Sequence, residues 1–314
     1  MKTVFFYSFK GGVGRTQLLL NIAKYLTEER NKKIAIVDFD LYAPGLSYLA
    51  KFDQDKEGKS YLINYLINLF EEEESSLYYE NINDNLTLIP ATNPKNMTLY
   101  HDTLNKLSQY SYSVKKSAED RTFNIITLAD KVAEYLSREI SKINDNNFDY
   151  IFFDGRTGIT EVSDILFSKE IDLKIMISSY NKQNINGMQS ILNMMSEYLG
   201  GEKHKILRIL SPKPVNNKEC YKDILFKADL GESRDIRLRN MFDWIDTAEV
   251  PYEEEIVHND FEVWEELKKD NNYYKSVVSI AESIDSALDN NSRISKILKN
   301  GQILSDTENS IKRL

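Results

Sequence analysis

The sequence predicts an α/β fold with a single doubly wound, mostly parallel sheet and helices on both faces. Short apolar runs alternate along the chain with segments whose apolar residues recur at helical spacing. The apolar runs are continuous, which is typical of parallel strands that are buried on both faces. A glycine-rich stretch joins the first apolar run to the first helical segment, and such a strand–loop–helix unit is where an α/β sheet can bind phosphate.

The expected elements follow one another in the order that such a sheet needs. Strands are expected at 3–8, 33–38, 85–90, 148–154, 172–178 and 205–210, with a shorter strand-like piece at 247–250. Helices are expected at 15–30, 59–74, 121–143, 185–199, 261–267 and 272–288. This pattern predicts one domain over residues 1–290, followed by a polar C-terminal tail at 291–314 that forms a helix or frays.

Residues 91–120 interrupt this pattern as a polar insertion. The segment is rich in Ser, Asn, Tyr and Lys, and no strand is expected in it. A long segment without regular structure inside a domain is often functional, so one interpretation is a lid or a docking insertion. The alternative is a surface excursion with one helix near Thr98–Leu107.

The stretch that joins the first strand to the first helix reads SFKGGVGRTQ, residues 8–17. Its glycines allow a tight turn in which backbone N–H groups point at one anion, and the helix N-terminus adds its positive end. Thr16 stands where a hydroxyl binds Mg²⁺, and Arg15 carries a planar fork that chelates phosphate oxygens. The alternative is a glycine-rich turn without a ligand. The predicted phosphate site comprises Lys10, Gly11, Gly12, Val13, Gly14, Arg15, Thr16 and Gln17.

This stretch departs from the ordinary Walker A pattern, because Phe9 replaces its first glycine and Arg15 replaces its lysine. It resembles the deviant Walker A loop of ParA/MinD-like ATPases, with Lys10 as the signature lysine, and in particular the variant branch whose loop reads KGGVGR. The resemblance implies binding of ATP and Mg²⁺, slow hydrolysis and a homodimer that sandwiches ATP. In such a dimer Lys10 reaches the phosphates of the other subunit.

Two aspartates follow the second strand. Asp38 and Asp40 are two residues apart, so they point the same way, toward the sheet edge where nucleotides bind. They begin a D-x-D-x-x-x-P segment that ends at Pro44 and resembles switch I of the ParA/MinD family. The resemblance implies that Asp38 supports the metal shell and Asp40 positions the attacking water. The alternative is that these acids cap a helix at Leu46.

The strand at 148–154 ends in Asp154, at the Walker B position where a carboxylate holds Mg²⁺ through water. The sequence therefore predicts a metal site formed by Thr16, Asp38 and Asp154.

A second motif follows directly. Residues 154–158 read DGRTG and resemble the D-x-R-T-G element that accompanies the KGGVGR loop. Arg156 is a candidate catalytic residue, together with Lys10 and Asp40, because it could reach a γ-phosphate in cis or in trans as an arginine finger does. The alternative is a structural ion pair of Arg156 with Asp38, Asp40 or Glu161.

Two prolines are expected beside the nucleobase of the bound nucleotide. MinD-like proteins often end the strand that corresponds to 205–210 in an asparagine that reads adenine, whereas here Ser211 and Pro212 follow it. Pro251 follows the strand-like piece, and the family often places the backbone of such a segment next to the base. The resemblance therefore implies Pro212 and Pro251 as cofactor contacts, without an asparagine that selects adenine.

The composition restricts the function classes. The 314 residues carry a net charge of −9, which does not favour nucleic acid or anionic lipid as a partner. The single cysteine, Cys220, excludes an internal disulfide and fits a reducing cytoplasm. No apolar stretch is long enough to span a membrane, and a glycine-rich loop at residue 8 leaves no room for a cleavable signal peptide. We therefore expect a cytoplasmic protein.

The main functional hypothesis is an ATPase switch that forms a homodimer on ATP and controls a partner protein, an effector or a sensor. The resemblance to the KGGVGR branch implies a role in bacterial conflict or antiphage systems. A second hypothesis is a nucleotide-binding scaffold with little or no hydrolysis. Partitioning ATPases that associate with DNA or membrane are a further alternative, which the acidic balance disfavours.

Overall fold

The computed structural model describes residues 1–52, 58–116, 121–143, 147–158, 163–198, 204–213, 242–253 and 271–289. Several expectations concern other residues and lie outside the described part: the helix at 261–267, the tail at 291–314, and the surroundings of Glu161 and Cys220. The division of the chain at residue 290 therefore stays a prediction.

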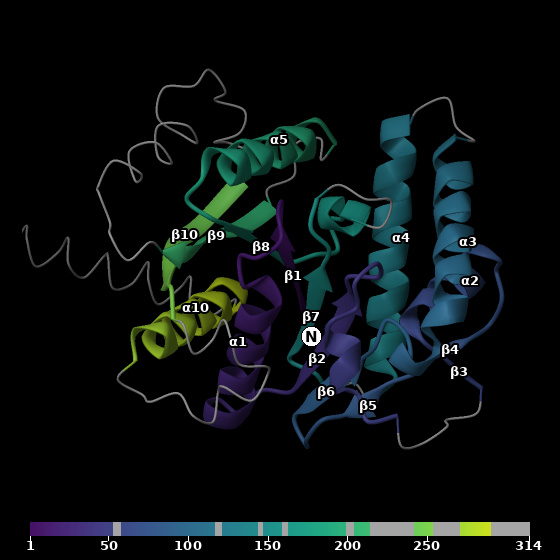
Figure 1. Ribbon diagram of the computed structural model, residues 1–314, viewed down its shortest axis with the longest axis horizontal. Helices are drawn as coiled ribbons and strands as arrows, with labels where there is room; N and C mark the ends of the chain where they lie inside the picture. Colours follow the sequence, from purple (N-terminus) through teal and green to yellow (C-terminus); the bar gives the residue numbers. More distant parts are fainter. Residues whose placement is uncertain are drawn as a thin grey trace, which may run out of the picture.

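Within the described part, one sheet of eight strands forms the centre of the molecule (Figure 1). Its strands are β1 (Lys2–Ser8), β2 (Ile34–Phe39), β5 (Glu80–Asn81), β6 (Leu86–Ile89), β7 (Tyr150–Gly155), β8 (Leu173–Ser178), β9 (His204–Lys213) and β10 (Phe242–Pro251). Their spatial order is β10-β9-β8-β1-β7-β2-β6-β5, and all neighbours are parallel except β5 and β6. The predicted doubly wound, mostly parallel sheet is confirmed.

Helices cover both faces of this sheet. They are α1 (Arg15–Glu29), α2 (Leu62–Phe70), α3 (Met97–Lys116), α4 (Arg121–Ser141), α5 (Lys182–Tyr198) and α10 (Asn272–Leu288). Three 3₁₀ helices, η1 (Leu46–Leu49), η2 (Pro94–Asn96) and η4 (Ser163–Phe167), and a two-stranded ribbon of β3 (Lys59–Ser60) and β4 (Ser76–Leu77) complete the described elements.

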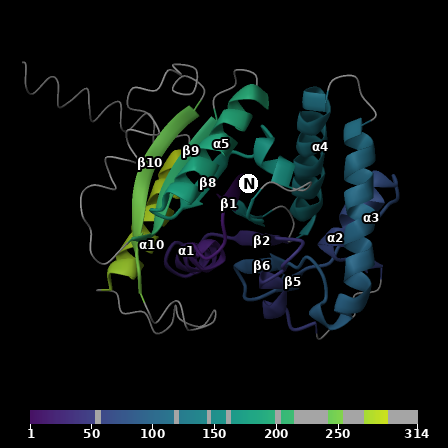
Figure 2. The same cartoon turned by 45° about the horizontal axis from the view of Figure 1, so that its top comes forward.

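An apolar core lies between the sheet and the helices on each of its faces. One core joins α1 and α10 to the sheet, and α10 contacts β8 and β10 as well as α1. The other core joins α2, α3, α4 and α5 to the opposite face. Figure 1 shows α1 and α10 on one side and α5 on the other, and Figure 2 shows α3 and α4 side by side at the far end from β10. The strands are apolar on both faces because both faces are covered.

The register brings the predicted site residues to one edge. Phe6 of β1 and Asp38 of β2 both pair with Asp154 of β7, so the ends of these central strands lie together. The loop after β1, the segment after β2 and the segment after β7 all leave this carboxyl edge, where open α/β sheets bind ligands.

Three elements differ from the expected bounds. The helix expected at 59–74 is α2, which is shorter because Glu72 adopts a left-handed conformation (φ 59°) that ends the helix. The short strand-like piece expected at 247–250 is part of β10, which has ten residues and is therefore a full strand of the sheet. Its acidic side chains, such as Asp243 and Glu249, interrupt the apolar run that marks a fully covered strand.

The segment at 91–120 holds η2 and α3 rather than a loop without regular structure. The helix α3 extends beyond the alternative of one helix near Thr98–Leu107 at both ends. Tyr100, Leu104 and Leu107 are buried at helical spacing and form the face that packs on the core. A narrow apolar stripe on a polar helix explains why the composition alone concealed the helix.

Candidate functional site

The loop between β1 and α1 is open toward solvent. Gly12 and Gly14 both have φ of 75°, a conformation that favours glycine. A Cβ added at Gly11 or Gly12 would meet nothing within 4 Å, so there is room above the backbone. Gly14 is the N-cap of α1, no side chain caps the helix and no acid lies in its first turn. The helix therefore presents unsatisfied N–H groups at the loop, as an anion site requires.

Beneath the loop, Arg15 joins two aspartates from neighbouring strand ends. Its Nε donates to Asp154 Oδ1 at 2.7 Å and one terminal nitrogen donates to Asp40 Oδ2 at 3.2 Å. Thr16 Oγ1 donates to the second oxygen of Asp154 at 2.7 Å. The structure therefore brings together Arg15, Thr16, Asp40 and Asp154, all of which the sequence predicted. It places Arg15 on the carboxylates, whereas the sequence analysis assigned it to phosphate.

The opposite charges in this cluster stabilise one another in their ionised forms. Burial opposes the charge of Arg15, but Asp154 and then Asp40 more than offset it and raise the pKa of the guanidinium. Burial raises the pKa of Asp40, and the charge of Arg15 partly counteracts this rise. Asp40 keeps one buried oxygen, Oδ1, without a hydrogen-bond partner. The cluster thus retains an acceptor that is not used in the protein's own contacts.

Asp38 has a different environment. It is fully buried, and its Oδ2 accepts hydrogen bonds from the backbone N–H and the hydroxyl of Ser47, each at 2.7 Å. Burial, and next the charge of Asp154, raise the pKa of Asp38 to about 8. The contact with η1 agrees with the alternative that Asp38 caps a helix at Leu46. Its Oδ1 is buried without a hydrogen-bond partner, and Asp38 pairs with Asp154 in the sheet register. The sequence analysis did not identify Ser47.

Arg156 lies against an aromatic ring. Its guanidinium carbon is 3.9 Å from the centre of the Tyr42 ring. Among the described residues no ion pair with Asp38 or Asp40 forms, and Glu161 lies outside that part. One terminal nitrogen of Arg156, Nη1, is buried without a hydrogen-bond partner. Tyr42 was not identified from sequence, although it lies inside the D-x-D-x-x-x-P segment.

Lys10 stands at the entrance of the loop. It is half-buried, and within the described part no hydrogen bond or ion pair engages it. The preceding residue is held firmly: a Cβ added at Gly187 of α5 would lie 2.0 Å from the Phe9 ring, so the ring packs directly on the glycine. The start of the loop is therefore anchored on α5, while the Lys10 ammonium keeps its hydrogen-bonding capacity.

A small cavity adjoins the other end of the loop. It has a volume of about 150 Å³ and lies between the start of α1, the ends of β9 and β10, and α10. Pro212 and Pro251 both line it, as does Gln17, whose Nε2 is buried without a partner. The sequence analysis did not identify the two tyrosines in its wall, Tyr252 and Tyr273. The cavity and the loop form one continuous surface because Gly12, Val13 and Gly14 belong to both.

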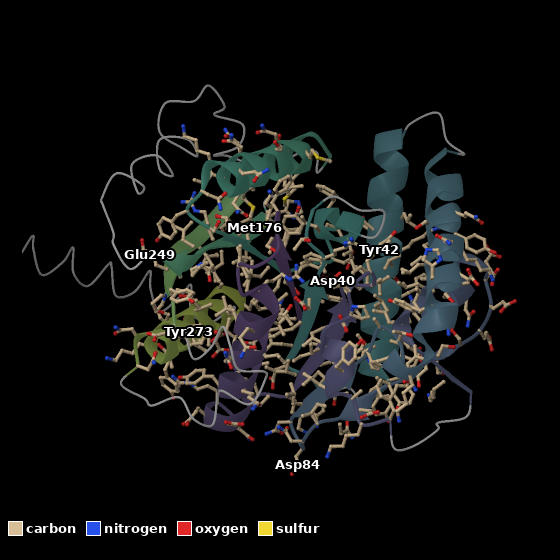
Figure 3. All side chains as sticks on the ribbon, viewed as in Figure 1. Asp40, Tyr42, Asp84, Met176, Glu249 and Tyr273 are labelled. Carbon is tan, nitrogen blue, oxygen red and sulfur yellow. The ribbon has the colours of Figure 1, made fainter. Side chains whose placement is uncertain are left out.

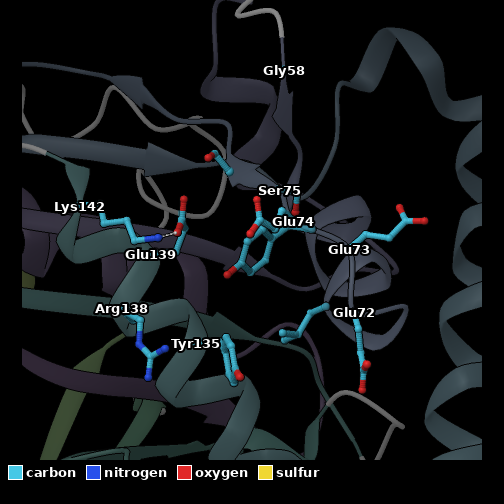
Figure 4. Close-up of a pocket in the computed structure, with 12 residues that line it drawn as sticks. Gly58, Glu72, Glu73, Glu74, Ser75, Tyr135, Arg138, Glu139 and Lys142 are labelled. Atoms are coloured by element: carbon cyan, nitrogen blue, oxygen red, sulfur yellow. Dashed lines mark hydrogen bonds and ion pairs between the residues drawn. The ribbon is translucent and has the colours of Figure 1, made fainter.

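A larger cavity lies elsewhere. It measures about 800 Å³ and opens between the end of α2 and α4 (Figure 4). Glu72, Glu73 and Glu74 line it, and its cations Arg138 and Lys142 are already paired with Glu134 at 2.8 Å and Glu139 at 2.7 Å. An anionic ligand would be repelled by these carboxylates, and none of the loop residues takes part. The smaller cavity beside the loop is therefore the candidate site despite its size.

The oxygen ligands at the loop suit magnesium. Thr16 and Asp154 offer a hydroxyl and a carboxylate within hydrogen-bonding distance of each other, and Mg²⁺ usually takes few protein ligands besides water and phosphate. In the described part of the chain, no group of three or more His, Cys, Asp or Glu residues could hold a metal by itself. A search of the described helices finds none that is both long and apolar enough for a membrane span.

Comparisons with known proteins agree with this geometry. A family model described as an AAA domain, AAA_31, matches residues 1–206. A Chlamydia psittaci virulence plasmid ParA family protein, pGP5-D, is 35% identical over 92 residues, 29% of this chain. The chain spans only about a third of that relative's length, 34%.

Solved structures resemble the whole described fold. Apo McdA from Cyanothece matches with a TM-score of 0.59 and 15% identity, over 90% of this chain and 99% of that one. A plasmid partition protein from Borrelia burgdorferi bound to AMPPNP matches with a TM-score of 0.55 and 19% identity, over 90% of this chain and 97% of that one. The cell division ATPase MinD of Pyrococcus furiosus matches with a TM-score of 0.55 and 16% identity, over 90% of this chain and 98% of that one. At these identities the likeness establishes the fold.

Proposed function

The chain belongs to the AAA_31 family of AAA domains and has the ParA/MinD-like P-loop fold, and from this premise we propose that it binds Mg-ATP and hydrolyses it slowly as a molecular switch. The observation that carries the proposal is the Thr16–Asp154 hydrogen bond of 2.7 Å beneath an open glycine loop. A hydroxyl and a carboxylate at the N-terminus of a helix form the metal and phosphate end of a nucleotide site.

Each site residue then has a role. Thr16 and Asp154 would hold Mg²⁺, directly and through water, with Asp38 behind them. A bound Mg²⁺ neutralises charge on the phosphates. Asp40, with its free buried oxygen, would orient the attacking water, and the small cavity lined by Pro212 and Pro251 would receive the base. These assignments place phosphate and base at the two ends of one surface.

Arg15 contacts Asp154 and Asp40 in this structure, and it is also the residue at which the glycine-rich loop passes into α1. We propose that Arg15 transfers from the carboxylates to phosphate oxygens when nucleotide binds. A triphosphate supplies more negative charge than Asp40 does, and the planar fork suits bidentate contact. Asp40 would thereby be released for its role in hydrolysis.

The second candidate function is a nucleotide-binding scaffold with little turnover. The specific observation that favours it is the contact of Arg15 with Asp40 at 3.2 Å, because an arginine that stayed there would block the residue that orients water. Steady-state ATP hydrolysis, measured beside nucleotide retention, separates the two functions. Retention without turnover supports the scaffold.

The metal assignment can be tested by calorimetric titration with a non-hydrolysable ATP analogue, with and without Mg²⁺. Thr16→Val should abolish most of the Mg²⁺ dependence of binding, because it removes the ligand hydroxyl but keeps the shape. Thr27→Val on the same helix is the matched control, since within the described residues the Thr27 hydroxyl bonds only the carbonyl of Lys24. An unchanged Mg²⁺ dependence in Thr16→Val would contradict the assignment.

We further propose that ATP binding produces a homodimer in which Lys10 contacts the nucleotide of the other subunit. Its half-buried ammonium has no partner within the described part, and a triphosphate at an interface needs neutralisation. The dimer would control an effector or sensor protein in the cytoplasm, in a bacterial conflict or antiphage system. Nucleic acid and membrane are less favoured partners, because the net charge is −9.

Mixing two inactive variants tests the dimer. Lys10→Ala and Asp40→Ala should each hydrolyse little ATP alone, whereas mixed dimers contain one composite site with both functional residues and should regain activity. Lys24→Ala is a control for the loss of one surface cation. Heterodimers that form without any recovery would refute a trans role for Lys10. Gel filtration with and without ATP reports dimer formation independently.

A further inference from the structure

The segment after β2 connects the candidate site to the helix α3. Asp40 and Tyr42 lie near each other on this segment, as Figure 3 shows. The Tyr42 ring faces Arg156, and its hydroxyl lies 3.0 Å from Ser108 Oγ of α3. Tyr42 therefore lies between the arginine that follows β7 and the helix of the polar segment.

The contact with Arg156 has the geometry of a cation–π interaction. The guanidinium carbon lies 3.9 Å from the ring centre, well inside the distance at which a cation is attracted to an aromatic face. Both residues are half-buried, which strengthens the attraction compared with a fully exposed pair. Burial raises the pKa of Asp40, Arg15 counters this rise, and the charge of Arg156 counters it to a smaller extent.

The other side of the segment is fixed by α3. Besides the contact between Tyr42 and Ser108, the Tyr100 hydroxyl donates a hydrogen bond to the backbone carbonyl of Leu41. Tyr100 is buried, and α3 packs on both α2 and α4. Two residues that directly follow Asp40 are thus held by one helix.

Among the described residues, no carboxylate forms an ion pair with Arg156 that would fix it as a structural arginine. Its buried Nη1 has no hydrogen-bond partner. A guanidinium that is held by its face on an aromatic ring keeps all its N–H donors at the edge for another anion. The ring orients the cation without consuming its hydrogen-bonding capacity.

We propose that Tyr42 is a positioning residue that holds Arg156 ready for the phosphate end of the site, with its own place set by α3. The inference rests on the proposed ATPase function and adds to it a residue that the D-x-D-x-x-x-P motif leaves unspecified and a helix outside the motifs. Arg156 would contact the nucleotide, whereas Tyr42 would act only through Arg156. The polar segment at 91–120 would thereby influence hydrolysis without touching the nucleotide.

A double-mutant cycle tests this relation. Tyr42→Leu removes the aromatic face but keeps an apolar side chain, and it should lower kcat between about 2-fold and 30-fold, the range that a cation–π contact supports. The same substitution in an Arg156→Ala background should cause no further loss, because the residue on which Tyr42 acts is gone. Tyr42→Phe restores the ring and should recover most of the activity. KM should change little.

Binding supplies a readout that does not depend on turnover. The affinity for ADP with aluminium fluoride, which mimics the transferring phosphoryl group, should fall in Tyr42→Leu and in Arg156→Ala, and no further in the double variant. Affinity for ADP alone should stay unchanged in all three. Tyr48→Leu is the matched control, because Tyr48 lies on the same segment and is 65% exposed. Thermal melting without nucleotide confirms that each variant is folded.

The outcomes separate this inference from the function on which it rests. If the wild type hydrolyses ATP and the effects of Tyr42→Leu and Arg156→Ala multiply in the double variant, the positioning role is refuted and the ATPase function stands. Equal losses in Tyr42→Phe and Tyr42→Leu would also refute it, because the ring would then be irrelevant. If the wild type binds no ATP analogue, the proposed function fails, and the inference fails with it.

Discussion

Two of the cations that are buried in the described part of the chain, Arg15 and Lys174, lie at opposite ends of the sheet's strands and are held in different ways. At the carboxyl edge, Arg15 contacts the carboxylates of Asp154 and Asp40. Near the amino end of β8, the fully buried Lys174 donates to the backbone carbonyls of Ser168 and Ile171 at 3.0 and 3.2 Å. Its third contact is the Nδ1 atom of His204, at 3.2 Å, so none of its direct partners is an acid.

The direct partners decide whether the charge persists. Burial lowers the pKa of Lys174 to about 7, and the more distant Asp172 and Asp130 counter this only in part. Burial, and then the charge of Lys174, lower the pKa of His204 to about 4. Arg15 instead has a raised pKa, because two carboxylates touch it. A buried cation stays charged when acids contact it, which makes the carboxyl edge the end of the sheet that can act on anions.

The strongest test of this contrast replaces each cation by a similar apolar chain. Arg15→Met should lower the free energy of unfolding by about 3–5 kcal/mol, because it leaves Asp154 and Asp40 buried without a counter-charge. Lys174→Met should lower the free energy of unfolding clearly less at pH 7, because removal of a buried ammonium offsets the loss of its hydrogen bonds. Denaturant unfolding of both variants measures the difference. Equal losses would show that the carboxylate contacts do not matter.

The second test compares acids at the two ends. Asp40→Ala should retain the ATP analogue but lower turnover by about 10²-fold or more, the usual contribution of a group that activates the nucleophile. Asp172→Ala is the matched control, because Asp172 bonds Lys2 and Thr3 far from the loop. It should reduce stability and leave turnover unchanged. An Asp40→Ala variant that hydrolyses ATP like the wild type would remove Asp40 from the proposed site.

The third test uses pH. Lys174 binds a proton below about pH 10.5 in the unfolded chain but only below about 7 in the folded one. Between these values the unfolded state holds more protons, so the stability of the wild type should rise with pH by about 1.4 kcal/mol per unit relative to Lys174→Met. Below pH 7 the difference should become constant. Unfolding curves at pH 7, 8 and 9 measure the slope, and parallel wild-type and variant stabilities would refute the shift.

The smallest expected effect concerns the shape of the cation. Arg15→Lys keeps the charge but replaces the fork by a point charge, which cannot contact Asp154 through one nitrogen and Asp40 through another. It should cost about 0.5–1.5 kcal/mol of stability, the value of one hydrogen bond. A loss as large as that of Arg15→Met would show that the fork, and not the charge, stabilises the cluster.

Most strands and helices of the fold could be predicted from local patterns of apolar residues. Continuous apolar runs predicted β1, β2, β7 and β8, and helical spacing predicted α10 at 272–288, where it is found. The pattern failed where polar residues interrupt the apolar positions of an element. The acids of β10 and the polar face of α3 obscured both elements, because neither shows a continuous apolar run.

Which groups meet at the loop can be predicted from the chain alone. Chain order and parallel pairing place Thr16, Asp38, Asp40 and Asp154 at one edge, since strand ends of a parallel sheet meet there. How these groups pair depends on the three-dimensional packing. Arg15 lies on Asp154 and Asp40, Asp38 on Ser47, and Arg156 on Tyr42, because each side chain takes the partner that three-dimensional packing brings within reach, and sequence spacing does not encode those distances.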